Sequence, residues 1–413
     1  MKEKTGLKLK IVVALLAVLA VGIMSLAVTF YTTQQSLTLK GSDKIQLGLN
    51  GVYEEYGANA LIGGKDVSDQ VDISGEVDTS TPGTYCVIYK AGNLTMKRTV
   101  VVGDKMSPEL VLEPAEDTDL KLGDEFVEPG YKAVDENGND ITDKVVVEGA
   151  ELTKAGVNTI TYTVADDNGN KTRLSREVTV SPNTDYDAAG LPICMYHYVY
   201  DENDPPADLY DRFGNYISMQ ALEEELNWLN EEGYYYPTWE EVRAYVDGEL
   251  LLPDKSIVLC FDDGAKSFLK YGIPVLEKCK VPATSFVITS KDGEAKIAEN
   301  PSDYVYYESH THNMHRGGGH IGHGGIFTAI SYEDGMADLK TSIEICGSSD
   351  AFAYPYGDYN DHSRKMVEDS GFMIAVTTQY GKAYPGDDPM LLPRVRMSLG
   401  QSLDKFISMV APR

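Results

Sequence analysis

Three of the seven histidines in this 413-residue chain fall within one short segment. Residues 309–315 read SHTHNMH and contain His310, His312 and His315. Neutral imidazole is a common zinc ligand, and two histidines with one carboxylate leave coordination positions open for water. Packing alone does not account for this density of histidines, so the segment predicts a metal site.

Two adjacent carboxylates, Asp262 and Asp263, follow the continuous apolar run 257–261. Because side chains alternate at the end of a strand, one carboxylate can bind a metal while the other accepts a proton. A plain turn explains the pair equally well, since the similar segment 166–169 lies between predicted strands and needs no function. The histidine segment at 309–315, further along the chain, favours a catalytic interpretation of the Asp pair.

A third motif, FAYPYG at residues 352–357, also stands at the end of a predicted strand. Proline and glycine can shape a loop that offers a backbone N–H group to a substrate oxyanion. Taken alone, the motif would be interpreted as an ordinary Pro/Gly loop.

These motifs require a scaffold that brings them together, and residues 183–413 predict one. Short apolar strands alternate with helices, which indicates parallel pairing in an α/β barrel or a layered sheet. In such folds the chemistry lies just beyond the carboxyl ends of the strands. Strands are predicted at 193–196, 257–261, 283–288 and 351–353, and helices at 218–233, 271–280, 332–346 and 362–370.

Residues 36–105 and 106–182 form two copies of one predicted all-β unit. The segment 66–68 (Asp-Val-Ser) in the first matches 140–142 (Asp-Ile-Thr) in the second. Alternation with period two, broken by Gly, Asn and Asp turns, is typical of a small β-sandwich. Both units resemble the immunoglobulin-like repeats of bacterial surface proteins, which implies spacers, and neither carries a catalytic constellation.

Residues 11–30 contain no charge, and as a helix they would span about 30 Å, the thickness of a bilayer core. Four lysines precede this run, and positive flanks stay in the cytoplasm. We therefore expect a cytoplasmic stub and a transmembrane helix within residues 1–35, with the rest of the chain extracellular. The alternative is a cleaved signal peptide and a secreted protein, although the apolar run is longer than a usual signal core.

The chain is strongly acidic, with a formal net charge of −28. A nucleic-acid binder needs a basic surface that replaces counterions, so nucleic acid is excluded as a partner. The simplest interpretation of the charge is a soluble, self-repelling surface. Nothing in the sequence predicts a particular protein partner.

The three chemical motifs, in their order along the chain (Asp pair, histidine segment, FAYPYG), resemble the polysaccharide deacetylase family (carbohydrate esterase family 4) over about residues 190–400. The resemblance is carried by LPICMYHYV at 191–199, LCFDDG at 259–264 and PATSFV at 282–287. The opening strand and the histidine spacing are most similar to the branch that deacetylates poly-N-acetylglucosamine. The resemblance implies a distorted β/α barrel for residues 183–413.

The resemblance also implies roles for individual residues. Asp262 would be the general base that activates a water. Asp263, His310 and His315 would hold a divalent metal, which we predict to be Zn²⁺. The backbone N–H of Tyr356 would help to stabilise the oxyanion of the tetrahedral intermediate.

The chain departs from the family's pattern in three places. The two metal histidines are five rather than four residues apart, as in the poly-N-acetylglucosamine branch, which disfavours His312. Ala353 stands where the family carries an arginine that orients the base; Arg394 could supply that charge, or could be a structural surface residue. The family's late histidine, which protonates the leaving amine, is missing; His197 could approach the site, or could be an ordinary core histidine.

A glycine-rich segment, residues 316–325, follows the metal motif. Its composition predicts a mobile loop. A surface loop without chemistry is the preferred interpretation over one that brings His320 or His323 to the site.

The sequence therefore predicts a membrane-anchored, extracellular, metal-dependent N-deacetylase that acts on an N-acetylglucosamine-containing polysaccharide. Two alternatives stay open: a surface glycan-binding or adhesion protein with an inactive deacetylase domain, and an O-acetyl esterase that uses the same site. The motifs also leave open the polymer, the metal's identity, the general acid and the oligomeric state.

Overall fold

The computed structural model describes residues 35–47, 51–103, 107–115, 120–135, 138–166, 169–212 and 214–412. The predicted membrane segment 11–30 lies outside these residues. Among the residues described, no helix combines the length and the apolar character that crossing a membrane requires. The chain divides into two compact units. One holds the first repeat and parts of the second, and the other holds the remaining parts of the second repeat with the α/β domain.

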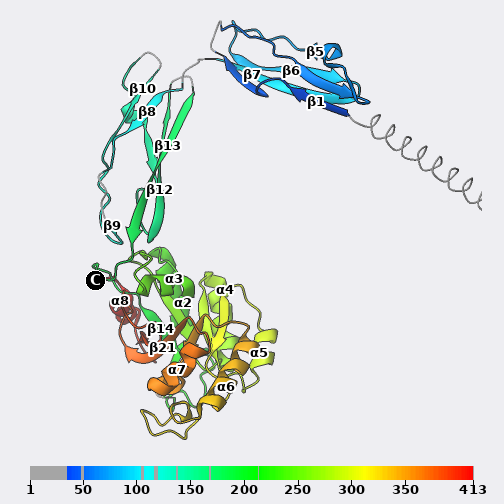
Figure 1. The fold of residues 1–413 in the computed structure, drawn as a ribbon. Helices are drawn as coiled ribbons and strands as arrows, with labels where there is room; N and C mark the ends of the chain where they lie inside the picture. Colours follow the sequence, from blue (N-terminus) through cyan, green and yellow to red (C-terminus); the bar gives the residue numbers. More distant parts are fainter. Residues whose placement is uncertain are drawn as a thin grey trace, which may run out of the picture. The chain divides into compact units, whose positions relative to one another are not determined.

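The first repeat consists of two sheets, as its alternating pattern predicts (Figure 1). Alternate residues of its longest strands, among them Val87, Tyr89, Val100 and Val102, are buried in one core. The sheets have the orders β1–β3–β4 and β2–β7–β6–β5. The bounds are β1 Gln35–Leu39, β2 Lys44–Leu47, β3 Ala58–Ile62, β4 Lys65–Asp66, β5 Asp72–Ser74, β6 Gly83–Ala91 and β7 Leu94–Val102.

The second repeat follows the same plan. Its sheets have the orders β10–β8 and β11–β12–β13–β9, and β9 runs parallel to β13 as β2 runs parallel to β7. Asp66 Oδ1 accepts a hydrogen bond from the Ser68 N–H (2.9 Å), and Asp140 Oδ1 accepts one from the Thr142 N–H (3.0 Å). This shared turn confirms the predicted alignment of the repeats. The bounds are β8 Glu109–Leu112, β9 Leu120–Lys121, β10 Tyr131–Val134, β11 Val146–Glu148, β12 Gly156–Ala165 and β13 Lys171–Ser181.

The α/β domain is built on a closed parallel barrel with the strand order β14–β17–β18–β19–β20–β21–β22. β14 closes it by pairing with both β17 and β22. Every residue of β14, β17, β18 and β20 is buried. Strands covered on both faces read as continuous apolar runs, which is how they appear in the sequence. The bounds are β14 Ile193–Tyr196, β17 Val258–Phe261, β18 Ala283–Val287, β19 Val305–Ser309, β20 Ala351–Ala353, β21 Ile374–Tyr380 and β22 Leu392–Arg396.

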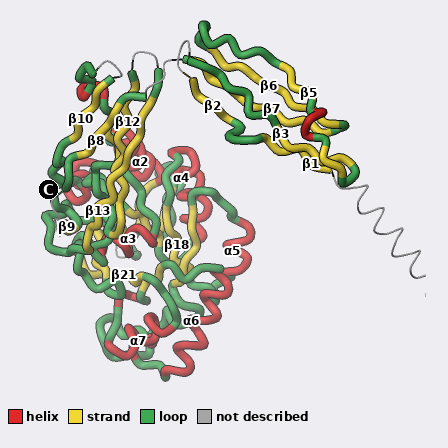
Figure 2. The backbone as a smooth tube through the Cα atoms, turned by 45° about the horizontal axis from the view of Figure 1, so that its top comes forward, coloured by secondary structure: helices red, strands yellow, loops and turns green. Residues whose placement is uncertain are grey.

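Helices lie around the outside of these strands (Figures 1 and 2). A short parallel pair, β15 (Tyr198–Tyr200) and β16 (Tyr216–Ser218), stands beside the barrel and carries site residues. The helices are α2 Met219–Glu231, α3 Trp239–Val246, α4 Ile273–Cys279, α5 Gly293–Glu299, α6 Tyr332–Cys346, α7 Asp361–Asp369 and α8 Leu403–Val410. The barrel alternative among the sequence expectations is therefore correct, and the layered sheet is not observed.

All five cysteines are free. Cys194 and Cys260 are buried within adjacent barrel strands, and Cys279 is buried at the end of α4. Cys346 is half-buried, and only Cys86, on β6 of the first repeat, is exposed.

Candidate metal centre and active site

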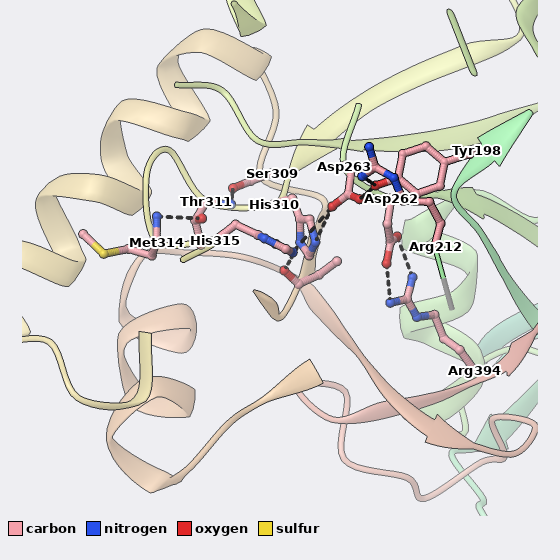
Figure 3. A network of polar contacts seen from close by, with 11 residues as sticks. Tyr198, Arg212, Asp262, Asp263, Ser309, His310, Thr311, Met314, His315 and Arg394 are labelled. Carbon is pink, nitrogen blue, oxygen red and sulfur yellow. Dashed lines mark hydrogen bonds and ion pairs between the residues drawn. The ribbon is translucent and has the colours of Figure 1, made fainter. Parts of the chain in front are cut away.

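The three chemical motifs meet at one cavity of about 420 Å³ at the carboxyl ends of the barrel strands. Asp262 and Asp263 follow β17, His310 follows β19, and Tyr356 lies in the turn after β20. Because parallel strands end at the same side of a barrel, segments nearly a hundred residues apart in sequence are brought together here. Figure 3 shows the network of polar contacts around Asp262, Asp263, His310 and His315.

Asp263, His310 and His315 form the one cluster of potential metal ligands found among the described residues. One ligand atom from each lies within 4.8 Å of the others. Asp263 Oδ1 is 3.8 Å from His310 Nε2 and 3.5 Å from His315 Nε2. Asp263 has a positive φ of 72°, a backbone strain that persists only where the surroundings require it. Two imidazoles and one carboxylate suit a divalent ion such as zinc and leave positions open for other ligands.

The orientation of His310 supports this assignment. Its Nδ1 lies 2.7 Å from the carbonyl oxygen of Ala353, and the side chain is almost fully buried. A carbonyl oxygen can only accept, so Nδ1 carries a proton and Nε2 is the nitrogen that faces Asp263. Metal-binding histidines are commonly held in this way. The residues present therefore fit a divalent metal.

The loop after β19 explains why the paired histidines are five residues apart. The carboxylate of Asp338, on α6, accepts hydrogen bonds from the backbone N–H groups of His312 (2.8 Å) and Asn313 (2.7 Å). Thr311, with a positive φ of 68°, accepts from the N–H of Met314 through its hydroxyl. His312 is turned away from the cluster, its Nδ1 3.0 Å from the hydroxyl of Thr289. The sequence preference against His312 agrees with this geometry.

His315 is neutral in its environment. Burial, followed by the neighbouring His310, lowers the pKa of His315 to about 4. Its ring packs against Tyr356, with 4.2 Å between the ring centroids. A neutral imidazole is the form that binds a metal, so His315 is ready to bind at neutral pH.

Asp262 is paired with Arg394 rather than with the metal cluster. Both guanidinium NH groups of Arg394 donate to the Asp262 carboxylate at 2.8 Å, and Arg394 Nε donates to the Thr377 carbonyl at 2.7 Å. Burial alone would raise the pKa of Asp262, but Arg394 holds it well below its usual range. Of the two sequence interpretations of Arg394, the surface residue is wrong: its side chain is 1% exposed.

His197 and Tyr356 complete the predicted set. His197 follows β14 and lines the cavity, and its buried Nδ1 has no hydrogen-bond partner among the described residues. Burial lowers the pKa of His197 although Asp262 and Asp263 oppose this. Tyr356 lies in the one-turn 3₁₀ helix Pro355–Gly357 with a positive φ of 59° and lines the same cavity.

Sequence reasoning missed Tyr198 and Arg212, which also line the cavity. The hydroxyl of Tyr198 donates to Asp263 Oδ2 at 2.9 Å, and Arg212 NH1 donates to the Tyr198 oxygen at 3.2 Å. Tyr198 lies in the MYHYV segment, so its position beside His197 was the available signal. Arg212 stands in an irregular loop and carried none.

The glycine-rich segment also contributes to the cavity. Asp358 is buried, and its carboxylate accepts hydrogen bonds from the N–H groups of His323 (2.9 Å) and Gly325 (3.0 Å). His323 Nδ1 is 3.2 Å from Asp358 Oδ1, and the His323 ring lines the cavity. The structure thus brings His323 to the cavity, as one sequence interpretation of the loop allowed; the preferred one, a surface loop without chemistry, stays a prediction. A buried carboxylate anchors the loop there, which composition did not reveal.

Comparison with known families divides the chain along the same lines. The family described as bacterial surface protein, Ig-like domain, matches residues 37–102 and 110–180. The polysaccharide deacetylase family matches residues 251–375.

Individual relatives match about half of this chain. A poly-beta-1,6-N-acetyl-D-glucosamine N-deacetylase of Staphylococcus epidermidis is 27% identical over 199 residues, covering 44% of this chain and 68% of the relative. The protein of that name from Escherichia coli K12 is 26% identical over 267 residues, covering 54% of this chain and 38% of its own length. The solved structure of the Streptococcus pyogenes deacetylase PplD in complex with acetate covers 55% of this chain and 100% of its own, with 23% identity and a TM-score of 0.47. The chain thus carries a polysaccharide deacetylase domain preceded in sequence by two Ig-like bacterial surface domains, and its homologues include poly-β-1,6-N-acetyl-D-glucosamine N-deacetylases.

Proposed function

We propose that this protein is a metal-dependent N-deacetylase that hydrolyses acetamido groups of poly-β-1,6-N-acetylglucosamine. One observation carries the proposal. A carboxylate held by a buried arginine, Asp262, lies directly beside a separate cluster of two imidazoles and a carboxylate. This arrangement separates proton transfer from metal binding, which is what amide hydrolysis by an activated water needs.

Asp263, His310 and His315 would hold the ion. When bound, a divalent ion such as zinc supplies Lewis acidity, which polarises an acetyl carbonyl and makes a nearby water more acidic. The N/O ligand set and its open positions favour zinc.

The chain's own residues perform the remaining steps. Asp262, kept ionised by Arg394, takes a proton from the attacking water as the water oxygen bonds to the acetyl carbon. The backbone N–H of Tyr356 donates to the developing oxyanion. The C–N bond then breaks, the amine leaves with a proton, and the products are acetate and a free amino sugar. We assign His197 to pass the proton that Asp262 takes from the water on to the amine, because it lines the cavity, its buried Nδ1 is unpaired, and burial disfavours a resting protonated form.

The proposed location is the outer face of a membrane. The uncharged run 11–30 behind four lysines supports an anchor, and the Ig-like surface domains support an extracellular position. Fractionation of cells that express the whole chain, compared with cells that express a chain starting at residue 36, tests the anchor. Protease added to intact cells tests the orientation.

The decisive experiment follows acetate release from β-1,6-linked N-acetylglucosamine oligomers by a fragment spanning residues 36–413. Release should require added zinc, should stop with a chelator, and should fall by about 10²–10⁴-fold in Asp262→Asn. Asp166→Asn is the matched control, because Asp166 lies in the similar DDNG segment of the second repeat and should have no effect.

Three results would point elsewhere. Release only from an O-acetylated glycan would identify an esterase. Zinc binding without release from either substrate would indicate a different acetylated substrate. Neither release nor zinc binding would overturn the enzyme proposal in favour of a glycan-binding protein.

A further inference from the structure

The two carboxylate oxygens of Asp263 have different partners (Figure 3). Oδ1 faces the two imidazoles, 3.5 Å from His315 Nε2 and 3.8 Å from His310 Nε2. Oδ2 instead accepts the hydrogen bond from the hydroxyl of Tyr198 at 2.9 Å. One oxygen is therefore directed at the cluster of potential ligands while the other is already occupied.

Arg212 fixes the direction of the hydrogen bond between Tyr198 and Asp263. Arg212 NH1 is 3.2 Å from the Tyr198 oxygen, and a guanidinium can only donate. The phenol oxygen accepts from Arg212, so its single proton is free to point at Asp263. The Arg212 guanidinium also lies over the Tyr198 ring, 5.0 Å from its centroid, in a cation–π contact.

Arg212 is itself held in place. Its Nε donates to Asp208 Oδ2 at 2.7 Å, and the hydroxyl of Tyr216 donates to Asp208 Oδ1 at 3.0 Å. The rings of Tyr198 and Tyr216 also contact each other, with 5.0 Å between their centroids. The chain of contacts therefore runs from the loop between β15 and β16 to the carboxylate beside the histidines.

We propose that Tyr198 is a positioning residue that restricts Asp263 to one ligand oxygen, Oδ1, and that Arg212 acts through Tyr198 by fixing the direction of its proton. The inference rests on the proposed role of Asp263 as a metal ligand. When a group that hydrogen-bonds to a metal ligand and orients it is removed, metal affinity typically falls by about 10–100-fold. Because Tyr198 occupies Oδ2 of Asp263, Oδ2 does not compete with Oδ1 for the ion. The ion would therefore be offered a single oxygen in a fixed position.

The test measures metal binding by the whole chain rather than turnover. Zinc affinity is measured by competition with a chromophoric chelator, and the visible spectrum of the Co²⁺-loaded protein reports the number of ligands. In Tyr198→Phe we expect zinc affinity to fall by about 10–100-fold. The Co²⁺ bands should also change in intensity, because Oδ2 becomes free to bind. Tyr200→Phe, on the same strand, is the control and should change neither readout.

Arg212→Met gives a second, independent variant, which also decides the matter if Tyr198→Phe fails to fold. It should weaken zinc binding less than Tyr198→Phe does, and the double variant should be no weaker than Tyr198→Phe alone. Unchanged zinc affinity and Co²⁺ spectra in both single variants would overturn the inference. Absence of zinc binding by the unaltered chain would instead overturn the proposed function, so the two failures are distinguishable.

Discussion

Arg394 contacts the carboxylate that, in the family pattern this chain resembles, an arginine at position 353 would orient. At position 353 there is no arginine, but the backbone carbonyl of Ala353 accepts from His310, and Arg394 reaches Asp262 from β22. Both ends of the Asp262–Arg394 pair are buried, with the arginine tied additionally to Thr377. A buried carboxylate with no arginine beside it would be protonated and could not act as a base.

Replacing Arg394 by Met should therefore affect both activity and stability. Deacetylation should fall by about 10²–10⁴-fold, the usual contribution of a general base. The free energy of unfolding should drop by about 3–5 kcal/mol at neutral pH, since one partner of a buried ion pair is left alone. Acetate release and thermal unfolding measure the two effects. Arg396→Met, two residues along the same strand, is the control for unfolding.

The pH dependence of that deficit follows from the sign of the pKa shift. In the unaltered chain the pKa of Asp262 is depressed, so the stability from the pair is present above about pH 4 and is lost only in stronger acid. In Arg394→Met burial raises the pKa instead, and folding takes up a proton. The variant's stability deficit should grow as pH rises above about 4, the pKa of Asp in an unfolded chain. A deficit independent of pH would show that the lost stability comes from packing and not from the charge of Asp262.

At the scale of single elements, α2 carries an acidic residue on its buried face. Glu225 is 3% exposed, and the hydroxyl of Tyr196 donates to its Oε2 at 2.7 Å. Burial raises the pKa of Glu225 to about 8, although the hydrogen bond from Tyr196 opposes the rise. Glu225 is therefore largely protonated in the folded protein at neutral pH, whereas in the unfolded chain it ionises near pH 4.3.

Stability should consequently fall as pH rises from about 4.5 to 8, by at most about 1.4 kcal/mol per pH unit from this residue. Glu225→Gln removes the linked proton and should become the more stable protein toward pH 8. Urea unfolding at pH 5, 6.5 and 8 measures the slope, with the exposed neighbour Glu224→Gln as the control. Equal slopes for Glu225→Gln and the unaltered chain would contradict the assignment.

The loop that carries His323 depends on a glycine at position 322. Gly322 has a φ of +57°, and a Cβ placed there would lie 1.9 Å from Asp358 Oδ1. Gly322→Ala should therefore release the loop from Asp358. A cost of about 1.4 kcal/mol already raises the open population tenfold, and a left-handed non-glycine residue alone costs about 1–3 kcal/mol.

Trypsin cleavage after Arg316, at the start of this loop, should accordingly become at least about ten times faster in Gly322→Ala. Gly317→Ala is the matched control, because no atom lies within 4 Å of a Cβ at Gly317. Similar cleavage rates in both variants would mean that Asp358 does not anchor the loop.

Elements with strong local signals could be predicted from the sequence. Helix α6 and strand β20 have the predicted bounds, and α2 starts after the predicted Ser218 cap, whose hydroxyl accepts from the Ala221 N–H. Helices α3, α5 and α8 were missed because seven or eight residues give too short a window for helical periodicity. Even so, the capping box between Thr238 and Glu241 was a readable signal for α3.

For the whole molecule, the sequence identified the residues of the site better than their partners. The types and spacing of Asp263, His310 and His315 predict a metal site, and the structure brings these three residues together. The contacts of Arg394, Tyr198 and Asp358 join segments 132, 65 and 35 residues apart. Such pairings depend on how the barrel closes, so no local pattern could reveal them. The predicted roles of the site residues remain predictions for the experiments above.

The free cysteines give the protein a built-in chemical probe of its own unfolding. Burial raises the pKa of the Cys194 and Cys260 thiols well above the usual range, and that of Cys346 to about 12. Thiolate is the reactive form, so these groups should resist alkylation and oxidation while the barrel is intact. A disulfide reagent should therefore titrate one thiol rapidly, Cys86, and all five in guanidinium. More than one rapid thiol would show that the barrel opens readily, and a single one would allow a fluorophore to be attached to the first repeat without altering the sequence.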